Sequence, residues 1–140
     1  NKYHWLLLVS AVYCCTMDAS GTALFTALTP AHKEGKVTAD ISVNPNSPIL
    51  KGHFPGHPVV PGACMLQVVK EVLERALDRT LQLKTADHLK FVSLIVADNQ
   101  RVVQLEITYR FLDEDAVFLT SRLFSGENLY FKLQCTFVKM

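Results

Sequence analysis

The chain has 140 residues, of which 49% are hydrophobic and 19% charged, and its formal net charge at pH 7 is +1. This length and balance predict one globular domain, residues 1–140, with a core of its own. Because the net charge is small and no block of like charges occurs, the sequence argues against nucleic acid as a partner.

The N-terminal stretch from Trp5 to Cys15 is nearly all apolar. It is too short to span a bilayer as a helix, which needs about 20 residues. A signal peptide is the alternative, but no cleavage site of small residues follows closely. We therefore interpret residues 1–20 as an N-terminal extension that packs as a buried strand or helix, and we expect a cytoplasmic protein without a membrane partner.

The four cysteines lack the spacing of a metal or disulfide framework, because two are adjacent and the other two are isolated among apolar residues: Cys14, Cys15, Cys64 and Cys135. A zinc or disulfide framework needs better spacing than this. We predict reduced thiols, as is usual in a cytosolic protein, and expect neither a metal nor a cofactor.

Two β-rich runs come next, at residues 22–28 and 36–43, and they flank the turn-like stretch 30–35, which predicts a hairpin. Residues 52–62 then contain three glycines and three prolines in eleven positions. Glycine permits positive φ and proline locks φ, so this segment predicts a rigid loop that aims a side chain. His53 lies at the start of this loop.

Residues 63–77 predict the one clear helix, since Leu66, Val69, Leu73 and Leu77 recur at helical spacing. Its first turns, residues 63–69, are apolar on all sides apart from Gln67. A helix that is apolar all round is buried all round, so we expect this half to be enclosed.

Four further β-rich runs complete the chain, at residues 89–96, 101–111, 116–125 and 129–138. The second run alternates apolar and polar residues with period two, which predicts a strand with one buried face. A hairpin, one long buried helix and an antiparallel meander predict an α+β architecture in which the sheet wraps around the helix.

The series from His53-Phe54-Pro55-Gly56 through Pro58 and Pro61-Gly62 into an apolar helix resembles the 3-hydroxyacyl-acyl-carrier-protein dehydratases. Lys90-Phe91, followed by residues 95–98, is similar to the strand after the helix in that family. The resemblance extends over about residues 22–138. It implies the hotdog fold, an antiparallel β-sheet wrapped around one long central helix. It also implies a homodimer, or a higher even oligomer, that acts on acyl carrier protein or CoA thioesters.

The resemblance implies a set of roles as well. Family members remove water from a (3R)-hydroxyacyl thioester to give the trans-2-enoyl thioester. His53 would be the base that takes the α-proton, a step that suits neutral imidazole. The backbone N–H of Gly62 would donate to the thioester carbonyl, because a helix N-terminus presents unpaired N–H groups and a positive dipole end. The implied substrate-binding residues are Phe54, Pro55, Gly56, His57, Val60, Pro61, Cys64 and Phe91.

The chain departs from the family at Gln67, where the family has Glu or Asp five residues after this glycine, supplied by the partner subunit to the leaving hydroxyl. Glutamine cannot act as an acid at neutral pH, although it can hydrogen-bond a hydroxyl or orient a water. Two substitutes stay open: protonated His53 returns the proton, or Glu71, one helical turn on, provides a carboxylate. A structural Gln67 that ties the loop down is the third possibility.

Several alternatives remain beside this interpretation. His57 and His53 have a spacing that suits a metal only on a helix, which the prolines forbid. We expect His57 to line the site entrance or to contact a phosphopantetheine arm, with a surface position as the alternative. Cys64 as a thioesterase nucleophile lacks an adjacent base. The open functions are a dehydratase, a hotdog thioesterase, and a non-catalytic acyl-binding or partner subunit. Candidate contacts for an acidic carrier protein are Lys33, Lys36, Lys51 and Arg101.

Overall fold

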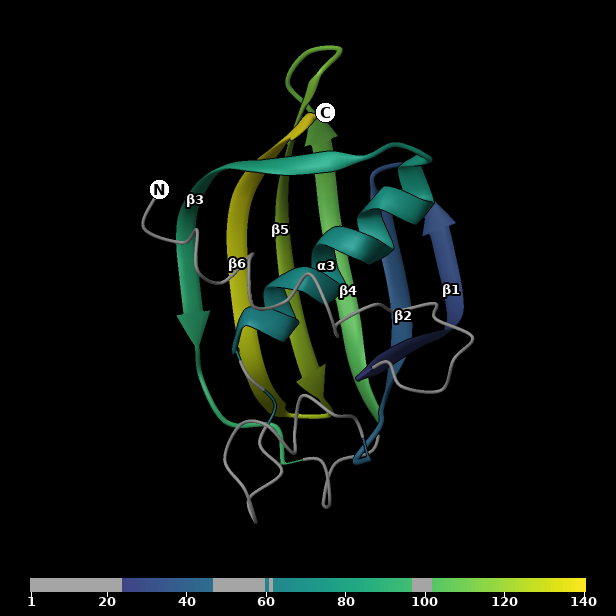
Figure 1. Cartoon of the computed structure of the whole chain (residues 1–140), viewed down its shortest axis with the longest axis vertical. Helices are drawn as coiled ribbons and strands as arrows, with labels where there is room; N and C mark the ends of the chain where they lie inside the picture. Colours follow the sequence, from purple (N-terminus) through teal and green to yellow (C-terminus); the bar gives the residue numbers. More distant parts are fainter. Residues whose placement is uncertain (1–23, 47–59, 61, 97–101) are drawn as a thin grey trace.

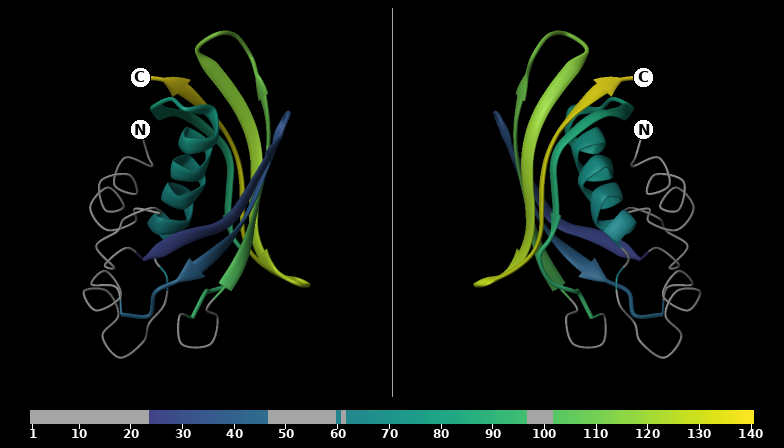
Figure 2. Two further views of the ribbon diagram at one scale, coloured as in Figure 1. Left: turned by 90° about the vertical axis from the view of Figure 1, so that its right-hand side faces the viewer. Right: turned by 90° about the vertical axis from the view of Figure 1, so that its left-hand side faces the viewer.

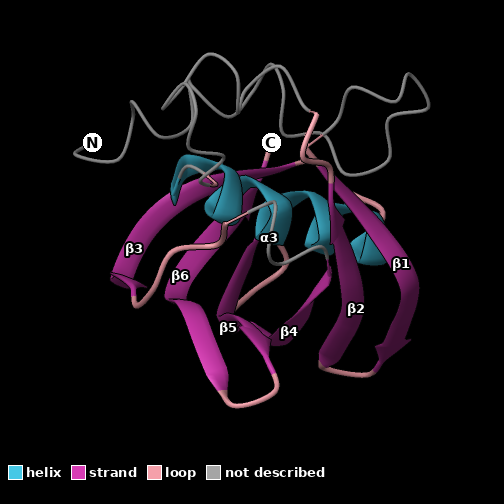
Figure 3. Ribbon diagram, turned by 90° about the horizontal axis from the view of Figure 1, so that it is seen from below, coloured by secondary structure: helices cyan, strands magenta, loops and turns pink. Residues whose placement is uncertain are grey.

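The computed structural model describes residues 24–46, 60, 62–96 and 102–140. Helix α3 (Gly62–Leu77) lies across one face of a six-stranded antiparallel sheet (Figure 1). Figure 3 shows the sheet curving around this helix, which confirms the predicted α+β architecture. The strands are β1 (Phe25–Lys33), β2 (Lys36–Val43), β3 (Leu81–Phe91), β4 (Val102–Phe111), β5 (Ala116–Ser125) and β6 (Asn128–Lys139).

The order of the strands across the sheet is β1-β2-β4-β5-β6-β3. Strands β4, β5 and β6 form the predicted meander, but β3 pairs with β6 and lies at the far edge. The expectation that all four runs after the helix pair in chain order is therefore wrong for the first run. Two strands separate β3 from its partner in the sequence, so no local pattern indicates this pairing.

The bounds of β3 also differ from the prediction, since this strand covers Leu81–Phe91 rather than residues 89–96. Leu81 and Leu83 are buried in alternation, but register shifts after Leu83 and after Ala86 interrupt the period of two. These irregularities hide the strand from an analysis of periodicity. Residues 92–95 lie outside any strand.

Strand β1 continues to Lys33 through Pro30, where a turn was expected. Proline removes a ladder hydrogen bond and is found on edge strands or at bulges. Both conditions hold here, because β1 is at the edge of the sheet and its register with β2 shifts between Leu28 and Ala31.

The core lies between α3 and the sheet, and Figure 2 shows the helix on one side of the sheet only. In β4 the predicted alternation holds, because Val103, Leu105 and Ile107 are buried. Residues 63–69 of α3 are all buried, which confirms the expectation for this half of the helix.

The C-terminal end of α3 is joined to β3 by polar contacts. Asp78 takes a left-handed φ of 52°, and the Arg79 N–H donates to the Glu74 carbonyl at 3.2 Å. This geometry ends the helix at Leu77, as predicted. The Glu74 carboxylate then accepts from the Leu81 N–H at 2.8 Å and lies 3.6 Å from the Lys70 ammonium.

Two findings bear on the cysteine and membrane predictions. Cys64 is disulfide-bonded, so the prediction of a reduced thiol is wrong at this position, whereas Cys135 is a free, buried thiol. Among the described residues, no helix has the length and apolarity that crossing a membrane requires.

Candidate functional site

The candidate site is built around the start of α3, where Gly62 is the first helical residue. Just before it, the Val60 N–H donates to the Ile95 carbonyl at 2.9 Å, and both side chains are buried. This hydrogen bond ties the chain that enters the helix to the segment that follows β3. The position of the start of α3 is therefore fixed by the segment after β3 as well as by the helix itself.

The ring of Phe91, at the end of β3, lies against Gly62. A Cβ atom on Gly62 would be 2.7 Å from both Cε1 and Cζ of this ring. Real Cβ atoms do not approach that closely, so the ring can keep this position only if residue 62 is glycine. The ring is also stacked on Phe131 of β6, with centroids 5.3 Å apart and an interplanar angle of 25°.

The segment after Phe91 is held by β6 rather than by a strand partner of its own. The Val92 and Ser93 N–H groups both donate to the Tyr130 carbonyl, and the Ser93 hydroxyl donates to the Leu129 carbonyl at 2.7 Å. Phe91 nonetheless remains 46% exposed, and Leu94 is 67% exposed. An exposed apolar surface thus borders the start of α3, which suits an acyl group or a protein partner.

The electrostatic character of this end of α3 comes from its backbone. The first four N–H groups of a helix have no partner inside the helix, and the aligned peptide dipoles place a partial positive charge there. The first turn contains no acidic residue that would neutralise it. The start of α3 can therefore polarise a carbonyl oxygen or stabilise a developing negative charge.

Gln67 lies in the second turn and is only 8% exposed. Its Nε2 donates to Oε1 of Glu71 at 3.4 Å, so the two residues considered for the missing acid are in contact. Cys64 is fully buried. Its disulfide removes the thiolate that a nucleophile would need, which argues against the cysteine thioesterase alternative.

The structure thus brings together Val60, Gly62 and Phe91 among the predicted site residues. The predicted base His53 lies outside the described residues and stays a prediction. The same holds for the predicted substrate-binding residues Phe54, Pro55, Gly56, His57 and Pro61, and for Lys51 and Arg101. In the ranges that the structure describes, no group of three or more His, Cys, Asp or Glu side chains is placed to hold a metal ion.

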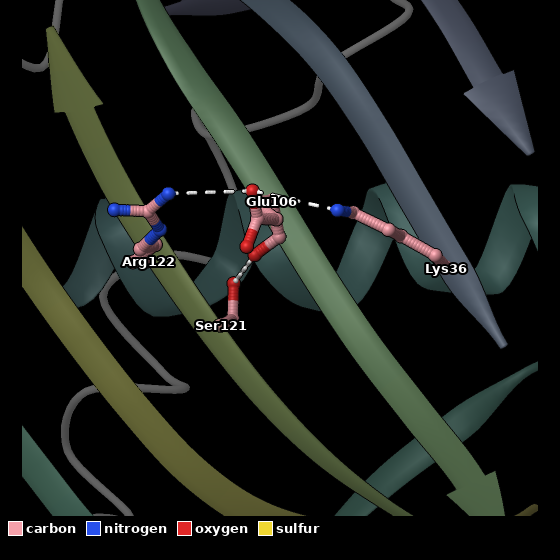
Figure 4. A network of polar contacts seen from close by, with 4 residues as sticks. All are labelled: Lys36, Glu106, Ser121 and Arg122. Carbon is pink, nitrogen blue, oxygen red and sulfur yellow. Dashed lines mark hydrogen bonds and ion pairs between the residues drawn. The ribbon is translucent and has the colours of Figure 1, made fainter. Parts of the chain in front are cut away.

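Lys36, a candidate contact for a carrier protein, belongs to a polar network on the sheet (Figure 4). Its Nζ lies 3.8 Å from Oε2 of Glu106, and Nη2 of Arg122 lies 3.4 Å from the same oxygen. The Ser121 hydroxyl donates to the Glu106 carbonyl at 2.9 Å. In Figure 4 α3 passes behind these strands, so the ion pairs are on the sheet face away from the helix.

Two contributors to the site were not predicted from the sequence. The Ile95 carbonyl acts through its backbone, which no side-chain pattern reports. Phe131 supports the Phe91 ring only because β3 pairs with β6 across the sheet, where Phe91 and Phe131 are register partners.

Comparison with known proteins identifies the family. The sequence profile described as "ApeI-like: ApeI dehydratase" matches residues 29–127, well over half of the chain. The chain belongs to this ApeI-like dehydratase family. The match includes α3, Gly62 and Phe91, and it agrees with the dehydratase resemblance of the loop before α3.

Relatives of this ApeI-like chain include curated 3-hydroxyacyl-[acyl-carrier-protein] dehydratases FabZ. It is 33% identical over 89 residues to FabZ of Haemophilus influenzae (strain PittEE), covering 59% of this chain and 59% of the relative. It is 30% identical over 83 residues to FabZ of Nitrosomonas eutropha, covering 52% of this chain and 58% of the relative. The matched region thus spans less than two thirds of these relatives.

Solved structures share the fold of this ApeI-like chain at low sequence identity. The dehydratase heterocomplex ApeI:P from Xenorhabdus doucetiae matches with a TM-score of 0.64 and 14% identity, covering 81% of this chain and 97% of the other. The PaaI protein of E. coli, from the phenylacetic acid degradation operon, has a TM-score of 0.62 and 11% identity, covering 89% and 86%. These similarities confirm the predicted hotdog fold.

Proposed function

We propose that the chain is a subunit of a dehydratase that removes water from a (3R)-hydroxyacyl thioester, carried by acyl carrier protein, to give the trans-2-enoyl thioester. The observation that carries the proposal is Gly62 as the first residue of α3 in a chain of the ApeI-like dehydratase family. The names of the FabZ relatives support the same reaction and carrier.

The first step is the binding of the thioester carbonyl. Its oxygen accepts a hydrogen bond from the Gly62 N–H, one of the N–H groups that has no partner within the helix. This hydrogen bond withdraws electron density from the carbonyl group and makes the α-proton more acidic. The helix dipole then stabilises the enolate-like charge that appears on the oxygen when the α-proton leaves.

His53 carries out both proton transfers of the elimination. Its neutral imidazole takes the α-proton, the Cα–H electron pair forms the Cα=Cβ double bond, and the Cβ–O bond breaks. The imidazolium returns its proton to the departing hydroxyl, which leaves as water. One residue thus serves both proton transfers, so no acid is needed at residue 67.

Gln67 is proposed to orient the departing hydroxyl. An amide carries both hydrogen-bond donors and an acceptor, so the side chain of residue 67 can hydrogen-bond a substrate hydroxyl although it cannot protonate it. A positioned general acid typically contributes about 10²–10⁴-fold in rate. We therefore expect this enzyme to be slower than a relative with a carboxylate at that position.

A homodimer is the assembly that we propose. In the described sheet, β3 pairs only with β6, so its outer edge is available to pair with a second copy. Phe91, Val92 and Leu94, at the end of this edge strand, are exposed apolar side chains that an interface would cover. Sedimentation equilibrium tests the assembly, and a monomer at micromolar concentration contradicts it.

A non-catalytic partner subunit is the second candidate function. Gln67 favours it, since a different hotdog chain would then provide the carboxylate. The structurally similar ApeI:P protein is itself described as a dehydratase heterocomplex. In this case the chain alone binds acyl thioesters without turnover, and activity appears only after a second hotdog subunit is added.

The deciding assay uses (3R)-hydroxyacyl thioesters on acyl carrier protein or on pantetheine, with enoyl absorbance and released thiol followed in parallel. Enoyl product that is abolished by His53→Ala supports the dehydratase. Thiol release in place of enoyl product identifies a thioesterase. Binding without either product supports the partner subunit.

A further inference from the structure

A pocket of about 310 Å³ lies between β1, β2 and the C-terminal half of α3. Figure 1 shows this half of the helix reaching toward β1 and β2. Val72, the lining residue nearest to Gly62 along the helix, is ten residues further on, which corresponds to roughly 15 Å at 1.5 Å per residue. This pocket is therefore separate from the start of α3.

The pocket exists because β1 bends and because small side chains surround it. The register between β1 and β2 shifts between Leu28 and Ala31, next to Pro30. Bulges of this kind bend a strand and locally disrupt its pairing with the neighbouring strand. Three alanines then leave space where larger core residues would fill it, and the apolar lining consists of Ala27, Pro30, Ala31, Val37, Val72 and Ala76.

His32 is one of two polar side chains that line this pocket. Its Nε2 lies 2.6 Å from the hydroxyl of Tyr109. In the neutral tautomer protonated at Nδ1, Nε2 accepts the tyrosine proton and Nδ1–H is a hydrogen-bond donor. The contact with Tyr109 holds the ring in place, and this tautomer leaves a donor on its other nitrogen.

Arg75 is the second polar side chain that lines the pocket. It is exposed, and among the described residues it forms no ion pair. The acidic neighbour Glu74 is instead bound to Lys70 and to the Leu81 N–H. The guanidinium charge is therefore available to an anion at the mouth of the pocket.

We propose that this pocket binds a small apolar carboxylate, at a site distinct from the thioester site. The apolar tail packs on Val37, Val72 and Ala76, and the carboxylate accepts from the guanidinium of Arg75 and from Nδ1–H of His32. Arginine matches carboxylate geometry with parallel N–H donors. An apolar cavity with a few convergent polar groups is the usual form of a small-ligand site, and this one is at the small end of the usual range.

Calorimetric titration with octanoate and with 1-octanol tests the proposal. The wild-type protein should bind octanoate more tightly than the alcohol. Arg75→Gln should weaken octanoate binding about tenfold or more, the effect of a lost charge-assisted hydrogen bond, while leaving octanol unchanged. Ala76→Met fills the cavity and should weaken both ligands.

Arg79→Gln is the matched control, because Arg79 is near the same helix end but lies over the Phe111 ring, 5.2 Å from its centroid, and does not line the pocket. Equal octanoate affinities for the Arg75→Gln and Arg79→Gln proteins would overturn the proposal. So would displacement of octanoate by a saturating acyl-pantetheine, since the acid would then occupy the thioester site.

Amide NMR on the wild-type protein makes the test independent of any variant that fails to fold. Octanoate should shift the amide signals of Ala31, His32 and Val37 and leave that of Phe91 in place. Shifts at Phe91 alone refute the pocket. Failure of the dehydratase assay does not affect this outcome, because the ligand and the readout are different.

Discussion

Phe91 and Gly62 are in such close contact that the ring of Phe91 must move if residue 62 carries a side chain. The contact joins the end of β3 to the first residue of α3, and an added Cβ would be 2.7 Å from two ring atoms. It places an exposed aromatic face beside the backbone N–H that we propose as the carbonyl donor. The shape of the surface at the start of α3 therefore depends on Gly62 and Phe91 together.

Gly62→Ala should lower dehydratase turnover by tenfold or more. The methyl group pushes the Phe91 ring off Phe131 and occupies the space next to the carbonyl-binding N–H. Because Phe91 is about half exposed and its ring can swing away, the cost in stability should be only about 1 kcal/mol, at the low end for overpacking. Enoyl formation and urea unfolding measure the two effects.

Gly62→Ala combined with Phe91→Leu is the control for that experiment. The smaller side chain accepts the methyl group, so the double variant should recover stability relative to Gly62→Ala alone. Additive losses in the double variant would show that the contact does not constrain residue 62.

Gln67→Glu should raise the dehydration rate by tenfold or more, because it restores a group that can protonate the leaving hydroxyl. It should also lower stability, since a carboxylate replaces the amide that donates to Glu71 at 3.4 Å. Two like charges in contact are unfavourable, and protonation in acid relieves them. The loss in unfolding free energy should therefore be larger at pH 8 than at pH 4.

The double variant Gln67→Glu with Glu71→Gln separates these effects. It should keep the gain in rate and recover the stability, because an amide at residue 71 no longer repels the new carboxylate. An unchanged rate for Gln67→Glu at saturating substrate would contradict the view that residue 67 limits turnover.

Glu74→Ala should lower the free energy of unfolding by about 1–2 kcal/mol without changing turnover. The variant loses the hydrogen bond from the Leu81 N–H, at 2.8 Å, and the contact with Lys70. Hydrogen bonds to charged groups are worth more than exposed ion pairs. Lys70→Ala removes only the ion pair and should cost less; an equal loss in both variants would assign the effect to the ion pair instead.

Cys135 should resist thiol reagents in the folded protein. Burial, with a smaller contribution from the charge of Asp87, raises the pKa of this thiol from 9.0 to about 12. The thiolate is the reactive form, so alkylation at pH 8 should label the Cys135 peptide only after unfolding. Mass spectrometry of the labelled peptides measures this, and rapid labelling under native conditions would refute it.

The same shift predicts how stability depends on pH. The folded pKa lies above the unfolded value, so the stabilisation is fully present below pH 9 and is lost as the pH rises from 9 toward 12. The difference in urea midpoint between the wild-type and Cys135→Ala proteins should shrink over this range. A constant difference would show that Cys135 does not titrate as its burial implies.

Local sequence patterns were sufficient for the elements with regular periodicity. Period-two alternation identified β4, and β5 matched its predicted bounds at Ala116–Ser125. Helical spacing identified α3 to within one residue at its start, and the first turns proved as enclosed as their composition indicated. Turn residues and the Pro61-Gly62 pair marked the boundaries, because their backbone preferences act locally.

Elements with irregular periodicity could not be predicted in the same way. The register shifts in β3 and the proline in β1 break the alternation on which the prediction depends, although tertiary pairing accommodates both. The contact between Gln67 and Glu71 could be predicted, because residues four apart lie on the same face of a helix. The disulfide of Cys64 was not, because the spacing of the four cysteines in the sequence does not indicate a pairing.

By itself, the sequence determined the helix, most of the strands and the position of Gly62 where the helix begins, since each depends on residues close together in the chain. Only the tertiary structure placed β3 beside β6 at the sheet edge, and with it the Phe91 ring against Gly62. The pocket between β1 and α3 is likewise visible only in the tertiary structure. These features come from the packing of distant segments, whose free energy is decided by shape and burial over the whole domain rather than by local preference.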